Sequence, residues 1–402
     1  MMQMPINPFE IYAPHEASPF LPGFHPFPKA WLWFTDEWIP HWVKKNYSQK
    51  EIWKNKPFSQ TDAAFFSRGV KELSTLFTQE RSRALASYFQ HAKYRSSYLL
   101  YFMPLQMAKF LTLFQIHSQA IDACLHHGSQ QRTLRIADLG SGPGTASLSF
   151  LLLLLEKNLS EIPPIEFFWF DLNTTIMQDG KKLAEALASQ FPKLRGKVKI
   201  YTQPGPWWEA TQTLKPTSLI FLGNVLNESG LPRNTSFWTP LLDQAQGGGM
   251  LFLEPAHKSP SQYLSSLRDK LLENHELPIW GPCLHTSACP LQGGRNWCHF
   301  SYPIRIPGNW FQWFSKDLAS ERKWLKFSYL WLASCAYPPK AWNPKVKRVI
   351  SDILEEHNPN VLLCNPDHPE RLFLDPKTTI HRGELIKMIP TSKKITKIIP
   401  RC

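Results

Sequence analysis

The chain has 402 residues, of which 45 are Lys or Arg and 32 are Asp or Glu, for a formal net charge of +13. This length exceeds the size at which one hydrophobic core usually stops growing, so we expect one elaborated domain or two domains. The 43% hydrophobic content is that of a globular protein. The excess of positive charge favours a polyanionic partner, and nucleic acid is the first candidate. The alternative is a basic surface that does not bind nucleic acid.

No segment with the pattern of a membrane span or a targeting peptide stands out in the sequence. The longest apolar run, Leu148 to Leu155, is far shorter than the ~20 residues that span a bilayer and predicts a buried helix. The first residues lack a positively charged start followed by an apolar stretch, and they are too acidic and Pro-rich for a transit peptide. We therefore expect a cytoplasmic monomer with no membrane partner, whose seven cysteines do not form a disulfide framework.

The first 124 residues predict an irregular arm followed by a helical region. Residues 1–60 mix Pro with aromatic residues without a period, as in Trp31-Leu32-Trp33-Phe34, and we expect an irregular segment anchored by these side chains. From Asp62 to Cys124 Gly and Pro are rare and apolar residues recur at three- and four-residue spacing, which indicates helices. Pro104 is expected to end or kink one of them.

Residues 125–280 predict the central domain, because strands and helices alternate there. The predicted strands are 134–139, 165–172, 198–202, 218–224 and 250–254, and the predicted helices are 146–157, 174–190, 236–246 and 259–274. This alternation implies right-handed crossovers and a doubly wound, mostly parallel sheet of the α/β class.

A glycine-rich turn follows the first predicted strand. Gly140, Ser141, Gly142 and Gly144 stand where a strand passes into a helix, and glycines there allow positive φ and the close approach of a ligand to the backbone. The G-x-G-x-G spacing departs from the G-x-G-x-x-G dinucleotide fingerprint, because position 145 is Thr. Asp138 precedes the turn. Its carboxylate suits the positively charged amino group and sulfonium of S-adenosylmethionine and would repel a pyrophosphate.

Two further residues complete the predicted cofactor site. Asp171 ends the second strand, where its carboxylate can accept hydrogen bonds from both ribose hydroxyls. Asn224 follows the fourth strand, at the edge where the ligand crevice of such sheets lies. We expect Asn224 to contact the methionine part of the cofactor or the methyl acceptor, and the alternative is an ordinary loop asparagine. Together these motifs predict an S-adenosylmethionine-binding domain.

Residues 281–402 predict a Cys-rich and β-rich elaboration with a basic tail. Strand-like pieces lie near 299–306, 326–333, 348–354, 361–364 and 371–375. The tail from Lys387 to Arg401 interleaves basic residues with Ile. It either lies on an anion or is a frayed, solvated end.

Three cysteines are close together in a Gly- and Pro-rich loop. Cys283, Cys289 and Cys298 have the spacing C-x5-C-x8-C. A loop of this kind has no periodic core contact to make, so the cysteines favour ligation of a metal or a cluster. Their spacing leaves zinc and a [4Fe–4S] cluster both open.

A fourth ligand has to come from outside the three loop cysteines. The candidates are Cys364, His285 and His299. A catalytic role for the Pro282-Cys283 pair, as in RNA cytosine-5 methyltransferases, is disfavoured because the pair does not follow the fourth strand directly. Cys335 lies in an apolar run and is expected to be a core thiol.

With these residues in view, the chain resembles the mitochondrial small-ribosomal-subunit methyltransferase-like assembly-factor family, which also has bacterial members. The cysteine segment that ends in Trp297-Cys298-His299-Phe300 is the most specific part of the match. The other matching segments are Tyr98 to Pro104, Asp138 to Thr145, Leu253-Glu254-Pro255 and Val361 to Cys364.

The resemblance implies a Rossmann-like class I methyltransferase fold and binding to the small ribosomal subunit and its rRNA during assembly. It also implies a four-cysteine [4Fe–4S] site at Cys283, Cys289, Cys298 and Cys364.

Two functions are consistent with these observations. The first is methyl transfer from S-adenosylmethionine to small-subunit rRNA, mainly by alignment of the reactants, with no catalytic side chain assigned. The second is a non-catalytic RNA-binding assembly factor with a vestigial or regulatory cofactor site and a structural cluster. Asn224-Val225-Leu226-Asn227 replaces the Asn-Pro-Pro-Tyr type of motif that holds an exocyclic amine for N-methylation, so the sequence does not predict the acceptor atom.

Overall fold

The computed structural model describes residues 29–48, 54, 56–79, 88–157, 159, 161–212, 214–226, 237–274, 277–303, 309–318, 324–339, 345–354, 359–374, 380–388 and 395–399.

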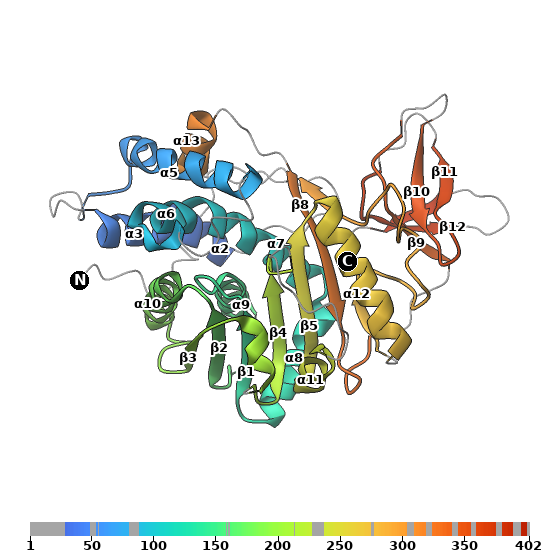
Figure 1. Cartoon of the computed structure of the whole chain (residues 1–402). Coiled ribbons are helices and arrows are strands. Elements are labelled where there is room, and N and C mark those ends of the chain that lie inside the picture. Colours follow the sequence, from blue (N-terminus) through green and yellow to red (C-terminus); the bar gives the residue numbers. More distant parts are fainter. Residues whose placement is uncertain are drawn as a thin grey trace.

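An eight-stranded sheet forms the centre of the molecule (Figure 1). Five strands run parallel in the order β3-β2-β1-β4-β5, β8 lies antiparallel beside β5, and both β6 and β7 pair with β8. The strands are β1 (Leu134–Leu139), β2 (Ile165–Asp171), β3 (Val198–Pro204), β4 (Thr217–Gly223), β5 (Ala245–Pro255), β6 (Ile279–Gly281), β7 (Phe300–Pro303) and β8 (Trp324–Leu332). This order is typical of class I methyltransferases, and the predicted doubly wound α/β fold is confirmed.

Helices cover both faces of the sheet because its strands are apolar on both sides. In β4, Leu219 and Phe221 join one core while Ile220 and Leu222 join the other. The first core includes side chains of α8 (Ser118–Gln130), α9 (Thr145–Glu156) and α10 (Thr174–Gln190), and the second includes side chains of α11 (Thr239–Gln244) and α12 (Lys258–Asn274). α9 is buried on all sides, as its apolar run predicts.

The N-terminal helices pack against one end of this domain. They are α2 (Lys29–Trp33), the π-helical turn η1 (Phe34–Trp38), α3 (Ile39–Tyr47), α5 (Gln60–Gln79), η2 (Tyr88–Gln90), α6 (Ala92–Ser97), the π-helical turn η3 (Tyr98–Phe102) and α7 (Met103–Ile116). A later helix, α13 (Asn309–Asp317), packs on α5. Pro104 lies in the first turn of α7, directly after the π-helical turn η3. The helical backbone continues without a gap from Ala92 to Ile116, so Pro104 does not end a helix there.

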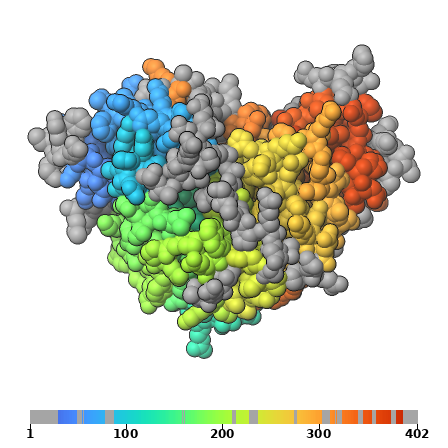
Figure 2. All heavy atoms as spheres, in the orientation of Figure 1, coloured from blue at the N-terminus to red at the C-terminus, as the bar shows by residue number. Residues whose placement is uncertain are grey.

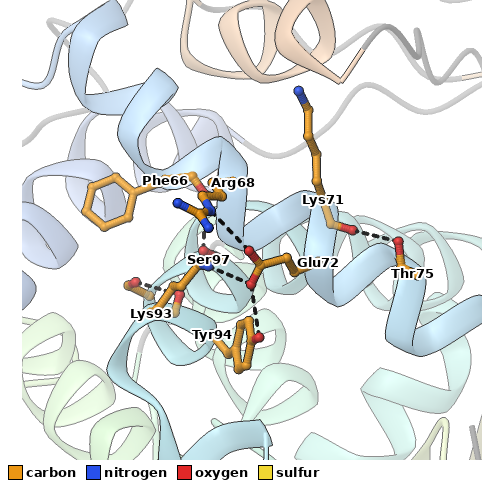
Figure 3. A network of polar contacts seen from close by, with 9 residues as sticks. Phe66, Arg68, Lys71, Glu72, Thr75, Lys93, Tyr94 and Ser97 are labelled. Atoms are coloured by element: carbon orange, nitrogen blue, oxygen red, sulfur yellow. Dashed lines mark hydrogen bonds and ion pairs between the residues drawn. The ribbon is translucent and has the colours of Figure 1, made fainter. Parts of the chain in front are cut away.

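Polar contacts join α5 to α6 (Figure 3). Glu72 of α5 accepts hydrogen bonds from Lys93 and Tyr94 of α6, at 2.5 and 2.9 Å. Ser97 donates its hydroxyl to the carbonyl of Phe66, at 3.2 Å. The two helices therefore meet along a polar seam as well as through apolar side chains.

One stretch of the described residues, Ala92–Ile116, is long and apolar enough to cross a membrane by length and composition alone. It comprises α6, η3 and α7, and 72% of its most apolar window is buried inside the protein. A core helix of a folded domain has the same composition.

A second, five-stranded antiparallel sheet follows the central domain. Its order is β11-β10-β9-β12-β13, and its strands are β9 (Val346–Val349), β10 (Asn360–Cys364), β11 (Glu370–Phe373), β12 (Leu385–Met388) and β13 (Ile395–Ile399). It has a small core of its own, which includes Val349, Val361 and Leu372. This sheet and the N-terminal helices lie on opposite sides of the molecule, and Figure 2 shows a hollow between them.

The prediction of an irregular arm is wrong for residues 29–47, because these residues are helical. Trp31, Trp33 and Phe34 are almost fully buried there, so the aromatic side chains anchor the segment as expected but within regular structure. Residues 1–28 of the predicted arm lie outside the described residues.

The C-terminal region differs from its prediction in two respects. β7 and β8 belong to the central sheet, so a domain boundary after residue 280 separates strands that pair with one another. Residues 395–399 of the basic tail form β13 and pair with β12, so this part of the tail is not a frayed end. Arg401 lies outside the described residues.

Candidate functional site

The glycine-rich turn connects β1 to α9 at the carboxyl edge of the sheet. Gly140, Gly142 and Gly144 all have positive φ, at 71°, 53° and 74°. A Cβ at Gly144 would lie 2.1 Å from the ring of Trp169, whereas one at Gly142 would have no neighbour within 4 Å. Packing therefore requires Gly144, and Gly142 leaves the backbone open to a ligand.

Asp171 lies beside this open glycine, as predicted. Its Oδ2 accepts a hydrogen bond from the backbone N–H of Gly142 at 2.7 Å, and its Oδ1 accepts one from Asn173 at 2.7 Å. Burial raises the pKa of Asp171, and these two donors oppose that rise. Each oxygen keeps a lone pair, so the carboxylate can still accept ribose hydroxyls.

Asp138 is buried beneath the turn and contacts the first turn of α9. Its Oδ2 accepts hydrogen bonds from the hydroxyl and the backbone N–H of Ser147, at 2.7 and 3.2 Å. Burial raises the pKa of Asp138 to about 7, against these two bonds and with a smaller contribution from the nearby Asp171. A cation bound between the two carboxylates would stabilise both of their charges. The structure thus places the glycine-rich turn, Asp138 and Asp171 close together, as the sequence predicts.

Asn224 occupies a strained position at the end of β4. Its φ is +61°, which is uncommon for a residue other than glycine, and its N–H donates to the carbonyl of Leu253 at 2.7 Å. Its Oδ1 is buried and has no hydrogen-bond partner among the described residues. Strain and an unpaired buried oxygen are typical of functional sites, and both favour a ligand-facing role over an ordinary loop asparagine. Asn227 lies outside the described residues.

Trp207 is a candidate that the sequence analysis missed. It follows β3 in the 3₁₀ helix η4 (Trp207–Gln212), lies close to Gly140, and is 3% exposed. Its indole N–H is buried with no hydrogen-bond partner in the part of the chain that the structure describes. No local pattern around Trp207 predicts this placement, because it depends on the packing of the loop after β3 against the turn after β1.

The N-terminal helices contribute a wall beside the turn. The hydroxyl of Tyr98 forms a hydrogen bond with Thr145, the first residue of α9, and burial raises the pKa of Tyr98 to about 12. Asp179 of α10 accepts from the hydroxyl of Tyr47 at 2.5 Å and from Arg95 at 2.7 Å. These contacts hold the N-terminal helical region against α9 and α10, the helices that follow β1 and β2.

All four predicted cysteine ligands line one cavity of about 40 Å³ between the central domain and the second sheet. They come from the loop after β6 and from the end of β10: Cys283, Cys289, Cys298 and Cys364. Burial raises the pKa of Cys298 well above its usual value, and the other three cysteines raise it further. The described residues contain no group of three or more His, Cys, Asp or Glu side chains placed to hold a single metal ion.

The two histidine candidates for the fourth ligand differ in position. His285 lines the cavity, and its Nε2 is 3.5 Å from the Sγ of Cys364. His299 instead contacts the carbonyl of Trp297 and the guanidinium of Arg382, each at 3.2 Å. The prediction that Cys335 is a core thiol is wrong, because this side chain is exposed at the turn after β8.

Two buried arginines beside the cavity were not predicted. Arg268 of α12 is 2% exposed and donates to the carbonyls of His285 and Ser287, at 2.6 and 2.7 Å. Arg348 of β9 is 5% exposed and donates to the carbonyls of Pro282 and Gly383, at 2.8 and 2.9 Å. They hold the cysteine loop from both sides.

A family model described as mitochondrial small ribosomal subunit Rsm22 matches residues 105–388, more than half of the chain. The chain belongs to the Rsm22 family. The matched range begins in α7 and ends in β12, so it contains the glycine-rich turn, both acidic residues and the four cysteines of the cavity. Membership of the Rsm22 family bears out the predicted link to the small ribosomal subunit, and the iron–sulfur site stays a prediction.

Solved structures with a similar fold share little sequence with this Rsm22-family chain. A probable spermidine synthase from Corynebacterium glutamicum is 13% identical, with 55% of this chain and 63% of that chain covered and a TM-score of 0.32. An O-methyltransferase family protein from Burkholderia thailandensis is 14% identical, with 55% and 66% covered and a TM-score of 0.32. A Listeria monocytogenes protein described as a class I S-adenosylmethionine-dependent methyltransferase is 11% identical, with 78% and 90% covered and a TM-score of 0.31.

The chain therefore spans slightly less than two thirds of the first two of these proteins. The strand order, rather than these likenesses, establishes the fold. No curated protein matches the chain.

Proposed function

We propose that this Rsm22-family protein binds S-adenosylmethionine at the turn after β1 and methylates small-subunit rRNA. The observation that carries the proposal is the bond between Gly142 and Asp171, which sets an open backbone next to a carboxylate that can hold a ribose. Asp138 supplies negative charge for the cofactor's amino group and sulfonium. A methyl sulfonium is intrinsically reactive, so holding it in line with a base atom supplies a large part of the acceleration.

Two observations support small-subunit rRNA as the partner. The description of the Rsm22 family names the mitochondrial small ribosomal subunit. The formal charge of +13 suits a phosphate backbone, because each neutralised phosphate releases counterions.

A non-catalytic assembly factor is the second candidate. Its support is the segment after β4, where the side chain of Val225 packs against Gly140: a Cβ on this glycine would lie 2.1 Å from Cγ1 of Val225. In the Asn-Pro-Pro-Tyr type of motif, this segment holds the amine that receives the methyl group. Here Val225 and Leu226 stand where that motif has its two prolines, and both are buried.

We further propose that Cys283, Cys289, Cys298 and Cys364 hold a [4Fe–4S] cluster, with a single zinc ion as the alternative. The four thiols line one cavity but are not placed to converge on one ion, and a cluster needs a wider spacing because each thiolate binds a different iron. When bound, the cluster would supply a covalent link between the loop after β6 and β10. The cysteines themselves position these two segments against each other.

Mapping of methylated rRNA nucleotides in a deletion strain tests the proposed activity. We expect loss of one methyl mark from small-subunit rRNA and its return when the intact protein is supplied. Immature small subunits that keep every mark would contradict the enzyme and support the assembly factor.

A further inference from the structure

Arg268 is hydrogen-bonded on several sides, including to the side chain of Cys283, and keeps one buried donor without an oxygen acceptor. Its two terminal nitrogens bond to the carbonyls of His285 and Ser287 and to the carboxylate of Asp269. Its Nε is buried and has no hydrogen-bond partner among the described residues. The side chain also lines the cysteine cavity. A buried N–H without an acceptor is destabilising, so we expect a bound group to supply an acceptor there.

The neighbours of Arg268 fix its orientation. Both oxygens of Asp269 accept hydrogen bonds from the backbone N–H of Cys289, at 3.1 and 2.9 Å. Arg268 is thus tied to the cysteine loop through Asp269 and directly through two loop carbonyls. The thiol of Cys283 lines the same cavity as the guanidinium. This network holds the guanidinium rigidly next to the thiols.

Arg348 of β9 brings a second positive charge near the cavity, because it donates to the carbonyl of the lining residue Pro282. Its hydrogen-bond acceptors among the described residues are two backbone carbonyls, and its guanidinium lies 5.8 Å from the centre of the Phe300 ring. Within the described residues it forms no ion pair with a carboxylate. Burying a cation in this way is costly unless an anion lies nearby. A negatively charged group held in the cavity would be that anion.

We infer that Arg268 donates its Nε–H to a sulfur of the group that the four cysteines hold, and that Arg268 and Arg348 together balance its negative charge. This inference rests on the proposed cluster. A [4Fe–4S] core held by four thiolates carries net negative charge, and hydrogen bonds to its sulfurs and nearby charge set its reduction potential. Arg268 is therefore a positioning residue that stabilises the cluster and raises its potential.

The test compares Arg268→Gln, Arg268→Lys and Lys270→Gln, each purified anaerobically as the full chain. Lys270 is an exposed residue of the same helix, so its variant loses the same charge away from the cavity. The measurements are iron and sulfide content, the rate of iron loss to a chelator, and the reduction potential. Removing a residue that hydrogen-bonds to a metal ligand commonly weakens metal binding about 10- to 100-fold.

We expect Arg268→Gln to release iron at least about tenfold faster than the native protein and to have a more negative potential. Arg268→Lys keeps the charge without the Nε–H, so it should release iron faster while its potential stays closer to the native one. It also serves as the test if the Gln variant does not fold. Lys270→Gln should match the native protein.

Unchanged iron release and potential in both Arg268 variants would overturn the inference alone. A native protein that carries no iron would instead overturn the proposed cluster, and the role of Arg268 with it.

Discussion

Asp138 is the buried acid whose protonation should control cofactor binding. Burial raises its pKa to about 7, so below this pH the carboxyl must release a proton before it can face a cation. We expect the affinity for S-adenosylmethionine to fall as pH drops from 7.5 to 5.5, by up to about tenfold per pH unit. In this range the cofactor's own amino group, with a pKa near 8, stays charged.

Calorimetry in buffers with different ionisation enthalpies would measure both the affinity and the released proton. Asp138→Asn should bind more weakly at pH 7.5 and lose the pH dependence. An affinity that is flat between pH 5.5 and 7.5 would show that Asp138 does not face the cofactor's positive charge.

Residues near the turn could be predicted from the sequence because their signal is local. Gly140, Gly142 and Asp138 lie within five positions, and Asp171 ends the next strand. Arg268 and Arg348 carry no such signal, because they lie 80 positions apart and bond to the same cysteine loop only once β9 docks beside it. Cys335 was predicted to be buried because it follows an apolar run, and such a run does not show where the strand ends.

The buried ion pair that joins α3 to α5 should be a main support of the helical region. Lys44 and Asp62 are 2.7 Å apart, with side chains only 4% and 8% exposed. Asp62 also accepts from the N–H of Ser59, which caps α5. We expect Asp62→Asn to lower the free energy of unfolding by about 3–5 kcal/mol, because it leaves the ammonium of Lys44 buried without a counter-charge.

Denaturant unfolding would measure this loss, with Glu72→Gln as the matched control. Glu72 joins α5 to α6 in the exposed network of Figure 3, where its side chain is 34% exposed. The control should change stability by no more than about 1 kcal/mol. Equal effects of the two substitutions would refute the distinction between the buried and the exposed pair.

The cysteine cavity links two elements that are distant in sequence, and single thiols can test this link. We expect Cys364→Ser to lose the bound iron, because it removes the only ligand that β10 supplies. Cys335→Ser should keep it, since Cys335 is exposed and does not line the cavity. Metal analysis and absorbance near 400 nm would distinguish the outcomes. If the native protein is colourless and contains one zinc ion, the site binds zinc and not a cluster. If Cys364→Ser keeps its metal, His285 is the fourth ligand.

Periodic elements of the central domain were predictable, and those that depend on distant partners were not. β1 and α10 have the predicted bounds, 134–139 and 174–190, because period and flanking residues mark them. Residues 30–34 lack an amphipathic period, because all five of their side chains are buried. β12 and β13 are short strands: β12 pairs with β9 and β13 pairs with β12, so both depend on the rest of the second sheet.

The whole molecule carries enough positive charge to make RNA binding salt-dependent. We expect the logarithm of the affinity for small-subunit rRNA to fall linearly with the logarithm of salt concentration. Truncation of the tail would remove β13, so substitution is the better probe. A Lys387→Gln and Lys397→Gln double variant should make the slope shallower by about 1–2 if the tail contacts phosphates.

Filter binding at several salt concentrations would measure the slope. Lys199→Gln, an exposed position on the edge strand β3, is the control and should leave the slope unchanged. Binding that does not depend on salt would argue against an RNA partner.

The central claim is that the turn after β1 holds S-adenosylmethionine, and calorimetry of Gly142→Arg tests it most directly. Gly142 and Gly196 both have positive φ, at 53° and 74°, and both face open space. Arg at either position is therefore equally strained, but only at Gly142 would it occupy the cofactor's place. We predict saturable binding by the native protein and by Gly196→Arg, and none by Gly142→Arg. Equal affinity in all three proteins, or no binding by the native protein, would contradict the account.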